Sequence, residues 1–242
     1  MDLQNNKLMT SKYTVFSFFF CCAFQFGFAQ SNSDLLNHYK AYYAQMQKQG
    51  DVQGIINAMT HLMVLEPNEA RQDTLAALYM NEGKYVQALN ILGIQKQDTD
   101  SDMAVEVKAV SLKSLNEPAR ALEHFEVLFQ RNPSVGLAYE LADLKIQIDD
   151  LVGANLSITY GIANSSDEMM KPYYETQTPY QVPIKAGFLY LKAIAKFREN
   201  PDSNHDVAVA ILDEALTMAP EFNLALLAKN AISNQKEAKE KQ

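Results

Sequence analysis

A two-residue turn pattern recurs along this chain at a constant interval, and it constrains the fold more than any other feature. The pattern occurs at Gly50-Asp51, Gly83-Lys84, Asn116-Glu117 and Asp149-Asp150, so each turn begins 33 residues after the one before it. An interval of this length is typical of repeat proteins, in which one unit cannot bury its apolar face alone and neighbouring units stack. The repeat therefore decides which fold class we expect.

The segments on either side of the turns have the spacing of helices. The run Thr74–Met80 before Gly83 is apolar at helical intervals, and glycine at 83 suits the left-handed position that ends a helix. Pro118 stands where the first turn of a helix tolerates proline. The chain has only 9 glycines and 8 prolines in 242 residues, which favours long helices over many short strands. Apolar residues follow Gly83 at positions i, i+3, i+4 and i+7: Tyr85, Ala88, Leu89 and Leu92.

The units resemble the tetratricopeptide repeat, whose paired helices touch through small residues and whose second helix often ends at a proline. In the third unit Ala121 and Pro133 are 12 residues apart, and the same spacing separates Ala208 from Pro220 in a displaced fifth unit. The chain departs from the family pattern in lacking tryptophan, in having Ile55 where a small residue is usual, and in having Asp100 at a proline position. The best match is the third unit, through Ala109, Leu112, Ala121, Phe125, Leu128 and Pro133.

This resemblance implies an all-α fold: a right-handed superhelical solenoid of about five antiparallel helix pairs with a C-terminal capping helix. Four regular units are expected over residues 30–163, and a fifth, divergent unit over residues 184–220. Between them lies an insertion at residues 164–183, rich in tyrosine and proline, which we expect to be a loop because its prolines forbid a continuous helix. Residues 221–242 are expected to form the capping helix and a charged tail.

Residues 1–29 are interpreted as an N-terminal signal peptide. Lys7 and Lys12 precede an apolar run, Tyr13–Phe28, and small residues at Gly27 and Ala29 suit a signal peptidase that cuts after Ala29. The protein would then be exported, either periplasmic or secreted, and the segment resembles those of Gram-negative proteins of the Bacteroidetes type. No membrane span is expected after cleavage.

Two alternatives for this segment remain open. It could stay attached as an anchor, although its apolar run is shorter than the roughly 20 residues of a helical span. It could also be a lipoprotein signal with Cys21 or Cys22 as the acylated residue, although bulky side chains precede both thiols.

Charge and residue usage exclude several classes of function. The net charge of −8 disfavours nucleic acids and anionic membrane surfaces as partners. The chain's only cysteines are Cys21 and Cys22, so a cleaved product would have no disulfide, cysteine-based zinc site or cysteine nucleophile. Neither a histidine pair with zinc-site spacing nor a glycine-rich phosphate loop occurs. We therefore expect no cofactor, no metal and no catalytic residue.

The resemblance implies that the first helix of each unit lines a concave face that binds a partner. The mixture of apolar and acidic side chains there favours a protein or peptide with apolar anchors and basic residues. Ala44 stands where the tetratricopeptide clamps that bind a chaperone's C-terminal carboxylate have asparagine, so that specific function is not indicated. The residues predicted to bind the partner are Lys40, Gln47, Asp73, Met80, Glu106, Lys113, Tyr139 and Asp143, with Ala77, Val110 and Ile146 between them.

The insertion offers a second candidate surface, through Tyr173, Tyr174 and Tyr180. Tyrosine combines a flat apolar face with a polar tip and is therefore suited to binding. The segment could bind a partner as a strap, or its tyrosines could pack back onto the helices and cover the joint between the fourth and fifth units.

Taken as a whole, the sequence predicts an exported, non-catalytic scaffold for protein–protein or protein–peptide interaction. A structural subunit of a cell-envelope complex is the alternative, and a hydrolytic enzyme is a remote one. The identity of the partner and the oligomeric state do not follow from these patterns.

Overall fold

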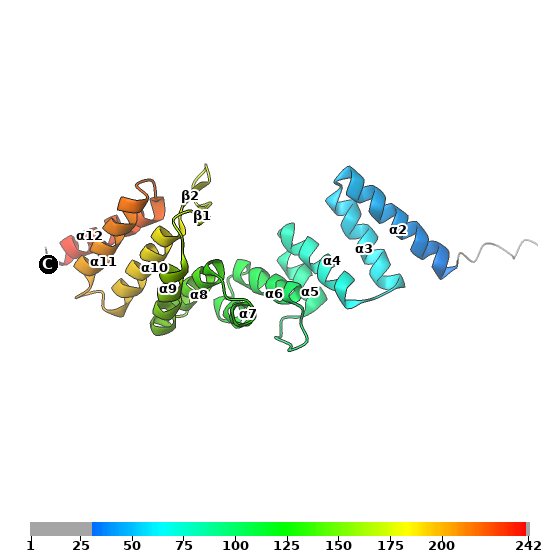
Figure 1. The fold of residues 1–242 in the computed structure, drawn as a ribbon, viewed down its shortest axis with the longest axis horizontal. Helices are drawn as coiled ribbons and strands as arrows, with labels where there is room; N and C mark the ends of the chain where they lie inside the picture. The colour runs from blue at the N-terminus through cyan, green and yellow to red at the C-terminus, as the bar shows by residue number, and fades with distance from the viewer. Residues whose placement is uncertain (1–30, 241–242) are drawn as a thin grey trace, which may run out of the picture. The chain divides into compact units, whose positions relative to one another are not determined.

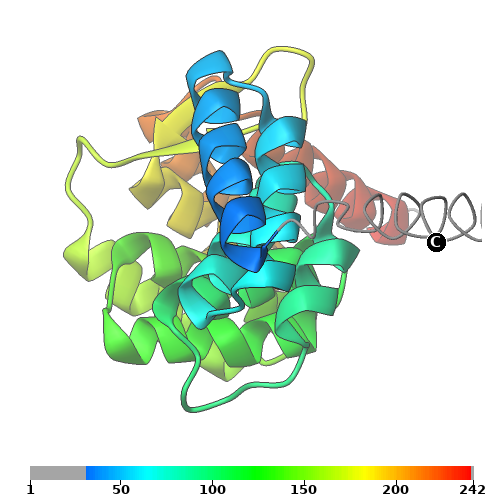
Figure 2. The ribbon, with the colours of Figure 1, turned by 90° about the vertical axis from the view of Figure 1, so that its right-hand side faces the viewer.

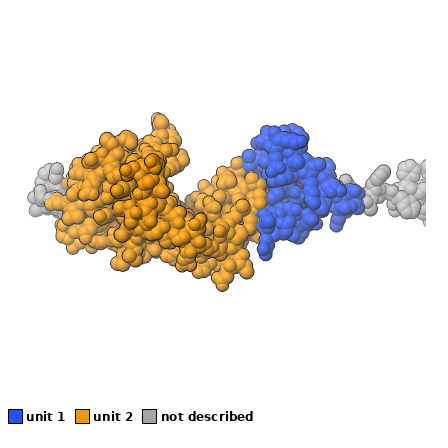
Figure 3. All heavy atoms as spheres, in the orientation of Figure 1, with its two compact units in different colours: residues 1–71 blue, residues 72–242 orange. Residues whose placement is uncertain are grey.

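The computed structural model describes residues 31–240, so the predicted signal peptide at residues 1–29 lies outside the described residues. The chain divides into two compact units, residues 1–71 and residues 72–242, which are coloured separately in Figure 3. Each unit is described by itself below.

The described residues form eleven α-helices and one two-stranded sheet (Figure 1). They run in the order α2 (Asn32–Gln49), α3 (Val52–Leu65), α4 (Glu69–Asn81), α5 (Tyr85–Leu92), α6 (Asp102–Ser114), α7 (Pro118–Arg131), α8 (Val135–Gln147), α9 (Leu151–Asn164), β1 (Met170–Tyr173), β2 (Tyr180–Pro183), α10 (Ile184–Glu199), α11 (His205–Met218) and α12 (Asn223–Glu240). The helices follow one another as five pairs, from α2 and α3 to α10 and α11, and α12 comes last. The prediction of an all-α helical solenoid with a C-terminal helix is confirmed.

Each of the four recurring turns holds one residue in the left-handed conformation. Gly50, Gly83, Asn116 and Asp149 have φ values of 67°, 69°, 60° and 67°. At each turn this residue donates its N–H to the carbonyl three residues before it, and the next residue donates to the carbonyl five residues before. This is the Schellman arrangement, which satisfies the last carbonyls of a helix while reversing the chain. Asparagine and aspartate replace glycine at two turns because they tolerate this conformation better than other residues do.

Several helix starts are fixed by side-chain caps. Ser101 and Ser134 accept hydrogen bonds from the backbone N–H three residues on and so cap α6 and α8. Asp51 and Asp150 do the same for α3 and α9. A cap of this kind typically stabilises a helix by about 1 kcal/mol. At α3 and α9 the turn and the cap are adjacent, so together they determine where these second helices begin.

Unit 1 contains α2, α3 and the first residues of α4. Gly54 lets α3 approach α2 closely, since a Cβ at this position would lie 2.4 Å from the sulfur of Met46. The ring of Tyr39 on α2 stacks on His61 of α3, with ring centroids 4.1 Å apart. These contacts join the first helix pair through a small residue and an aromatic pair.

In unit 2, α10 is the most central helix. It packs against α8, α9, α11, α12 and both strands, and these elements share one hydrophobic core. Phe188 of α10 is fully buried and lies against Gly161 of α9, where a Cβ would be 2.0 Å from the tip of the phenyl ring. The small residue at 161 therefore allows the fourth and fifth pairs to pack. No helix within residues 31–240 is long and apolar enough to cross a membrane.

The segment predicted to be a loop contains a β-hairpin, which corrects that prediction for its central part. Strand β1 pairs antiparallel with β2 in a register that places Tyr173 opposite Tyr180 and Met170 opposite Pro183. We call residues 170–183 the hairpin, and in Figure 1 it projects beyond the neighbouring helix ends. The prolines were correctly expected to prevent a helix, but they do not prevent short strands.

The prolines of the hairpin lie at positions where the ladder needs no N–H. The N–H of Ile184 donates to the carbonyl of Met169 at 2.7 Å, which sets the alternation of the antiparallel ladder. Hydrogen-bonded residue pairs recur at every second residue along each strand. Pro172 and Pro183 belong to the pairs in between, in which the backbone nitrogen points away from the partner strand. Each strand therefore carries one proline on its outer edge, and the third proline of the hairpin, Pro179, lies in the turn between the strands.

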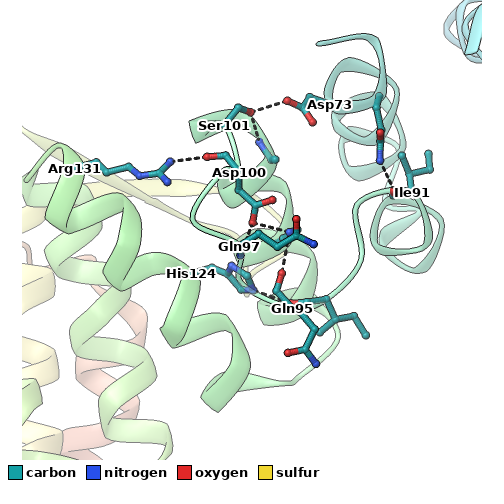
Figure 4. Close-up of polar contacts among 12 residues, drawn as sticks. Asp73, Ile91, Gln95, Gln97, Asp100, Ser101, His124 and Arg131 are labelled. Atoms are coloured by element: carbon teal, nitrogen blue, oxygen red, sulfur yellow. Dashed lines mark hydrogen bonds and ion pairs between the residues drawn. The ribbon is translucent and has the colours of Figure 1, made fainter. Parts of the chain in front are cut away.

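A second irregular connection joins α5 to α6 over residues 93–101 (Figure 2). Helix α5 is only 8 residues long, and the α5–α6 connection that follows it is fixed by side chains from other helices (Figure 4). Lys108 is fully buried, and its ammonium donates to the carbonyl of Gln95 at 2.9 Å and to the carboxylate of Asp100 at 2.7 Å. His124 Nε2 lies 3.0 Å from the carbonyl of Ile94.

The end of the α5–α6 connection is held in the same way (Figure 4). Arg131 donates to the carbonyl of Asp100 at 3.0 Å and to the carboxylate of Asp102 at 2.7 Å. Ser101 donates to the carboxylate of Asp73 at 2.6 Å. Asp100, which replaces the proline of the family pattern, thus makes the polar contacts that fix this chain reversal.

Candidate protein-binding groove

Unit 2 has an open depression of about 550 Å³, which we call the groove. Its walls come from α6, α7 and α8, and Lys171 of β1 closes one side. Figure 3 shows that the surface of unit 2 is hollowed beside the hairpin. The lining residues are Glu106, Val110, Lys113, Ser114, Phe125, Gly136, Leu137, Glu140 and Lys171.

Helical spacing places the α6 residues on one face. Glu106, Val110, Lys113 and Ser114 are separated by four, three and one positions, so they form a single stripe along the helix. Val110 is half-buried, whereas Glu106 and Ser114 are exposed. Leu137 of α8 supplies the facing apolar surface. The stripe therefore places the apolar side chain of Val110 between polar side chains.

Ion pairs join the two helices and the hairpin at one end of the groove. Glu140 of α8 accepts hydrogen bonds from Lys113 of α6 and from Lys171 of β1, the latter at 3.1 Å. The ammonium of Lys113 also lies 3.7 Å from the carboxylate of Asp143. We call these four residues the charged cluster.

The pKa values of the two carboxyl groups in the charged cluster shift in opposite directions. Burial would raise the pKa of Glu140, but the ammonium groups of Lys113 and Lys171 outweigh burial and lower it. Burial raises the pKa of Asp143, and the charge of Glu140 adds to this effect; the ammonium groups of Lys113 and Lys171 oppose it but do not overcome it. Glu140 is therefore ionised at neutral pH and anchors both lysines.

Tyr139 was predicted to line the groove, and the structure places it in the core instead. Only 6% of its surface is exposed, and its hydroxyl lies 2.7 Å from that of Tyr173 in the hairpin. Burial, together with the nearby Tyr173, raises the pKa of Tyr139 well above its usual value. Lys171 lies over the Tyr139 ring, with its nitrogen 4.7 Å from the centroid. The hairpin covers this side chain, and the repeat pattern alone gives no indication of that cover.

The three tyrosines of the insertion have different surroundings. Tyr173 is buried and contacts Phe222, the ring centroids lying 4.9 Å apart, and it stacks on Tyr180 at 5.6 Å. Tyr180 is half-buried and donates to Glu175; burial first, and then this hydrogen bond, raise its pKa to about 12. Tyr174 is 74% exposed. Tyr173 and Tyr180 thus pack back onto the helices, and Tyr174 presents its ring to solvent.

The other predicted residues do not line the groove. In unit 1, Lys40 pairs with Glu66 at 3.6 Å, and Gln47 donates to the hydroxyl of Tyr43. In unit 2, Asp73 accepts from Ser101, and Met80 packs against a small cluster of α4, α5 and α6. Two of the eight predicted side chains, Glu106 and Lys113, line the groove itself, and Asp143 joins the charged cluster beside it.

Histidine and acidic side chains are the ones that could hold a metal ion in the described part of the chain. Within the described part of the chain, no group of three or more His, Cys, Asp or Glu side chains is placed to hold a metal ion. The aspartates at 98, 100 and 102 alternate like the start of a calcium loop, but Asp100 is engaged by Lys108 and Asp102 by Arg131. His124 and His205 are buried, whereas His38 and His61 are exposed.

Among the solved structures similar to this chain, two are described as tetratricopeptide-repeat proteins. A tetratricopeptide repeat protein from Parabacteroides merdae is 17% identical with a TM-score of 0.59, over 81% of this chain and 72% of that one. YrrB, described as a TPR protein with an unusual peptide-binding site, is 14% identical with a TM-score of 0.61, over 79% and 90%. The MamA protein is 18% identical with a TM-score of 0.55, over 78% and 94%.

The fold is that of tetratricopeptide-repeat proteins. The sequence itself matches no protein-family model and is significantly similar to no curated protein. The tetratricopeptide fold therefore rests on the arrangement of helices together with the 33-residue recurrence of the turns.

Sequence reasoning missed three important groove residues. Leu137 and Glu140 lie on the same face of α8 as Asp143, at intervals of three residues, so helical spacing could have found them. Lys171 lies in the insertion, where the tetratricopeptide pattern is interrupted. Nothing in the local sequence indicates that this lysine reaches a carboxylate 31 residues earlier.

Proposed function

We propose that this protein is an exported, non-catalytic scaffold that holds a segment of another protein in the groove. The observation that carries the proposal is the groove itself, which combines apolar surface from Val110 and Leu137 with charged side chains at its rim. Binding sites commonly join an apolar centre to a polar rim in this way. The fold supports the proposal only in general terms, because one fold can serve many functions.

The groove is held in shape before a partner arrives. Glu140 fixes the ammonium groups of Lys113 and Lys171, and the ring of Tyr139 supports Lys171 from below. A surface that is already ordered loses less conformational entropy on binding. Apart from Glu106, the ionisable side chains that line the groove are engaged in ion pairs, an arrangement that favours binding over proton transfer.

The similarity to YrrB is consistent with this proposal, since that protein is described as having a peptide-binding site. We extend to this chain only the class of ligand, a peptide segment of a protein. The site residues proposed here come from its own groove.

The exported location is proposed from residues 1–29 alone. We expect N-terminal sequencing of the protein isolated from its native cells to begin at Gln30. A chain beginning at Met1 and recovered with membranes would instead support the anchor. A product beginning at Cys21 or Cys22 with an attached lipid would support the lipoprotein alternative.

The binding function can be tested by crosslinking from within the groove. A photo-crosslinking amino acid at Ser114, which is exposed and lines the groove, would be used to capture partners from an extract of the native cells. Leu137→Glu places a charge on the apolar wall, and Val152→Glu, at a 76% exposed position on α9, is the matched control. We expect a dominant crosslinked partner that is lost with Leu137→Glu and retained with Val152→Glu. Equal recovery with both variants would contradict the proposal.

A further inference from the structure

One carboxylate of the groove has no partner. Glu106 is exposed on α6, and no hydrogen bond or ion pair joins it to any residue that the structure describes. The charged cluster, in contrast, is internally paired, with the two ammonium groups of Lys113 and Lys171 facing the carboxylates of Glu140 and Asp143. Glu106 therefore adds an unpaired negative charge beside a cluster whose two ammonium groups and two carboxylates balance.

We propose, on the basis of the function proposed above, that the groove selects a segment with a basic side chain two residues away from an aliphatic one. The lysine or arginine of that segment pairs with Glu106. The aliphatic side chain packs against Val110 and Leu137.

The spacing follows from helix and strand dimensions. Glu106 and Val110 are four residues apart on α6, which separates them by about 6 Å along the helix axis. An extended peptide advances about 3.3 Å per residue, so two residues cover nearly the same distance. Side chains two residues apart in an extended segment also point to the same side, so both can enter the groove together.

The charge arrangement also disfavours an acidic ligand. An acidic side chain could reach an ammonium group only by competing with Glu140 for Lys113 or Lys171. It would also lie near the free carboxylate of Glu106. A basic segment meets neither obstacle, and it is attracted by a chain whose net charge is −8.

The experiment is a selection of random twelve-residue peptides displayed on phage against the purified protein, followed by fluorescence anisotropy on the selected peptides. We expect selected sequences to be enriched in lysine or arginine two positions from leucine, isoleucine or methionine. Glu106→Gln should weaken binding about two- to fivefold, as expected for an exposed ion pair. Glu106→Lys should weaken it further, and a peptide with glutamate in place of its basic residue should recover binding to this variant.

Glu123→Gln is the matched control, because Glu123 is an exposed glutamate on α7 outside the groove. Circular dichroism would confirm that each variant keeps its helices. The selected peptides could lose binding with Leu137→Glu and yet contain no basic residue, or bind Glu106→Gln as well as the unchanged protein. Either result would overturn this inference and leave the proposed function intact. Failure to select any peptide that depends on Leu137 would overturn both.

Discussion

The two connections that interrupt the repeat are held by opposite kinds of chemistry. The α5–α6 connection is fixed by polar groups, among which a buried ammonium, an imidazole and a guanidinium reach its carbonyl oxygens. The hairpin is fixed by aromatic rings, with Tyr173 packed against Phe222 and Tyr180. Both replace a short regular turn, and both keep the following helix in place.

These two connections show how a divergent repeat can tolerate irregular backbone. Residues 93–101 form no regular structure, so their carbonyl oxygens need donors from side chains such as Lys108 and His124. The hairpin satisfies much of its own backbone through the β ladder and needs apolar cover instead. The polar network of the α5–α6 connection depends on each hydrogen-bond partner being present. The aromatic packing of the hairpin spreads its stabilisation over several contacts.

The largest effect should come from Lys108→Met in the α5–α6 connection. The substitution keeps the aliphatic bulk but removes the ammonium that faces Asp100, whose side chain is only 10% exposed. Loss of one partner of a buried pair typically costs about 3–5 kcal/mol of unfolding free energy. Urea denaturation would measure this cost, and adding Asp100→Asn should recover part of it. Lys196→Met is the control, because it breaks an exposed pair with Glu199 and should change stability by less than about 1 kcal/mol. An equal loss from the two lysine substitutions would contradict the view that polar contacts hold the α5–α6 connection.

Tyr173→Ala in the hairpin should be the next most damaging change. It removes a buried ring from its contacts with Phe222 and Tyr180, and substitutions of this kind cost about 3 kcal/mol. Tyr173→Phe should cost only about 1 kcal/mol, because it removes the hydrogen bond to Tyr139 but keeps the ring. Thermal unfolding of both variants, with the exposed Tyr174→Ala as control, would show whether the ring or the hydroxyl dominates. A greater loss from the phenylalanine variant would refute the aromatic interpretation.

Gly187→Ala tests how closely the hairpin packs on α10. A Cβ at this position would lie 2.8 Å from the Tyr173 hydroxyl and 3.0 Å from the Tyr139 ring, so we expect a loss of about 1–2 kcal/mol in urea denaturation. Gly136→Ala is the control, since a Cβ there meets nothing within 4 Å and alanine favours the helix. The control should leave stability unchanged or slightly raised, and a destabilisation equal to that of Gly187→Ala would count against close packing.

The smallest effect should be a pH dependence that arises from His124. Burial lowers the pKa of this imidazole, and nearby Lys108 adds to the effect, while the hydrogen bond to Ile94 and the charge of Asp100 oppose it. The folded state therefore binds a proton less readily than the unfolded chain, so stability falls as the pH drops below about 6.5 towards the folded-state pKa. His124→Gln should flatten this slope between pH 7 and 5, and the exposed His38→Gln should not. Identical slopes in all three proteins would exclude the imidazole as the cause.

Much of the fold was predictable because it depends on local backbone geometry. The residues Gly83, Asn116 and Asp149 differ in type but share one conformation, so their spacing predicted the helix pairs correctly. The α5–α6 connection was harder to predict, since its path depends on donors such as Arg131, 31 residues away from the carbonyl that it contacts. Short strands that contain proline give little signal in the sequence either.

The candidate site was predicted less well for a related reason. Glu106 and Lys113 followed from helical spacing, and Glu140 could have done so. Tyr139 was misplaced because its surroundings depend on an insertion that lies more than 30 residues later, and on how that insertion folds back. Repeat spacing predicts which side of a helix faces a groove, but it gives no information on what else covers that side.

The outward-facing prolines of the hairpin have a consequence for the behaviour of the protein at high concentration. A two-stranded sheet normally leaves two rows of unpaired backbone groups, which can recruit strands from other molecules and begin aggregation. Here Pro172 and Pro183 remove one donor from each row, so neither edge can extend into a regular ladder. The hairpin can therefore project beyond the neighbouring helix ends without acting as a template for fibril growth.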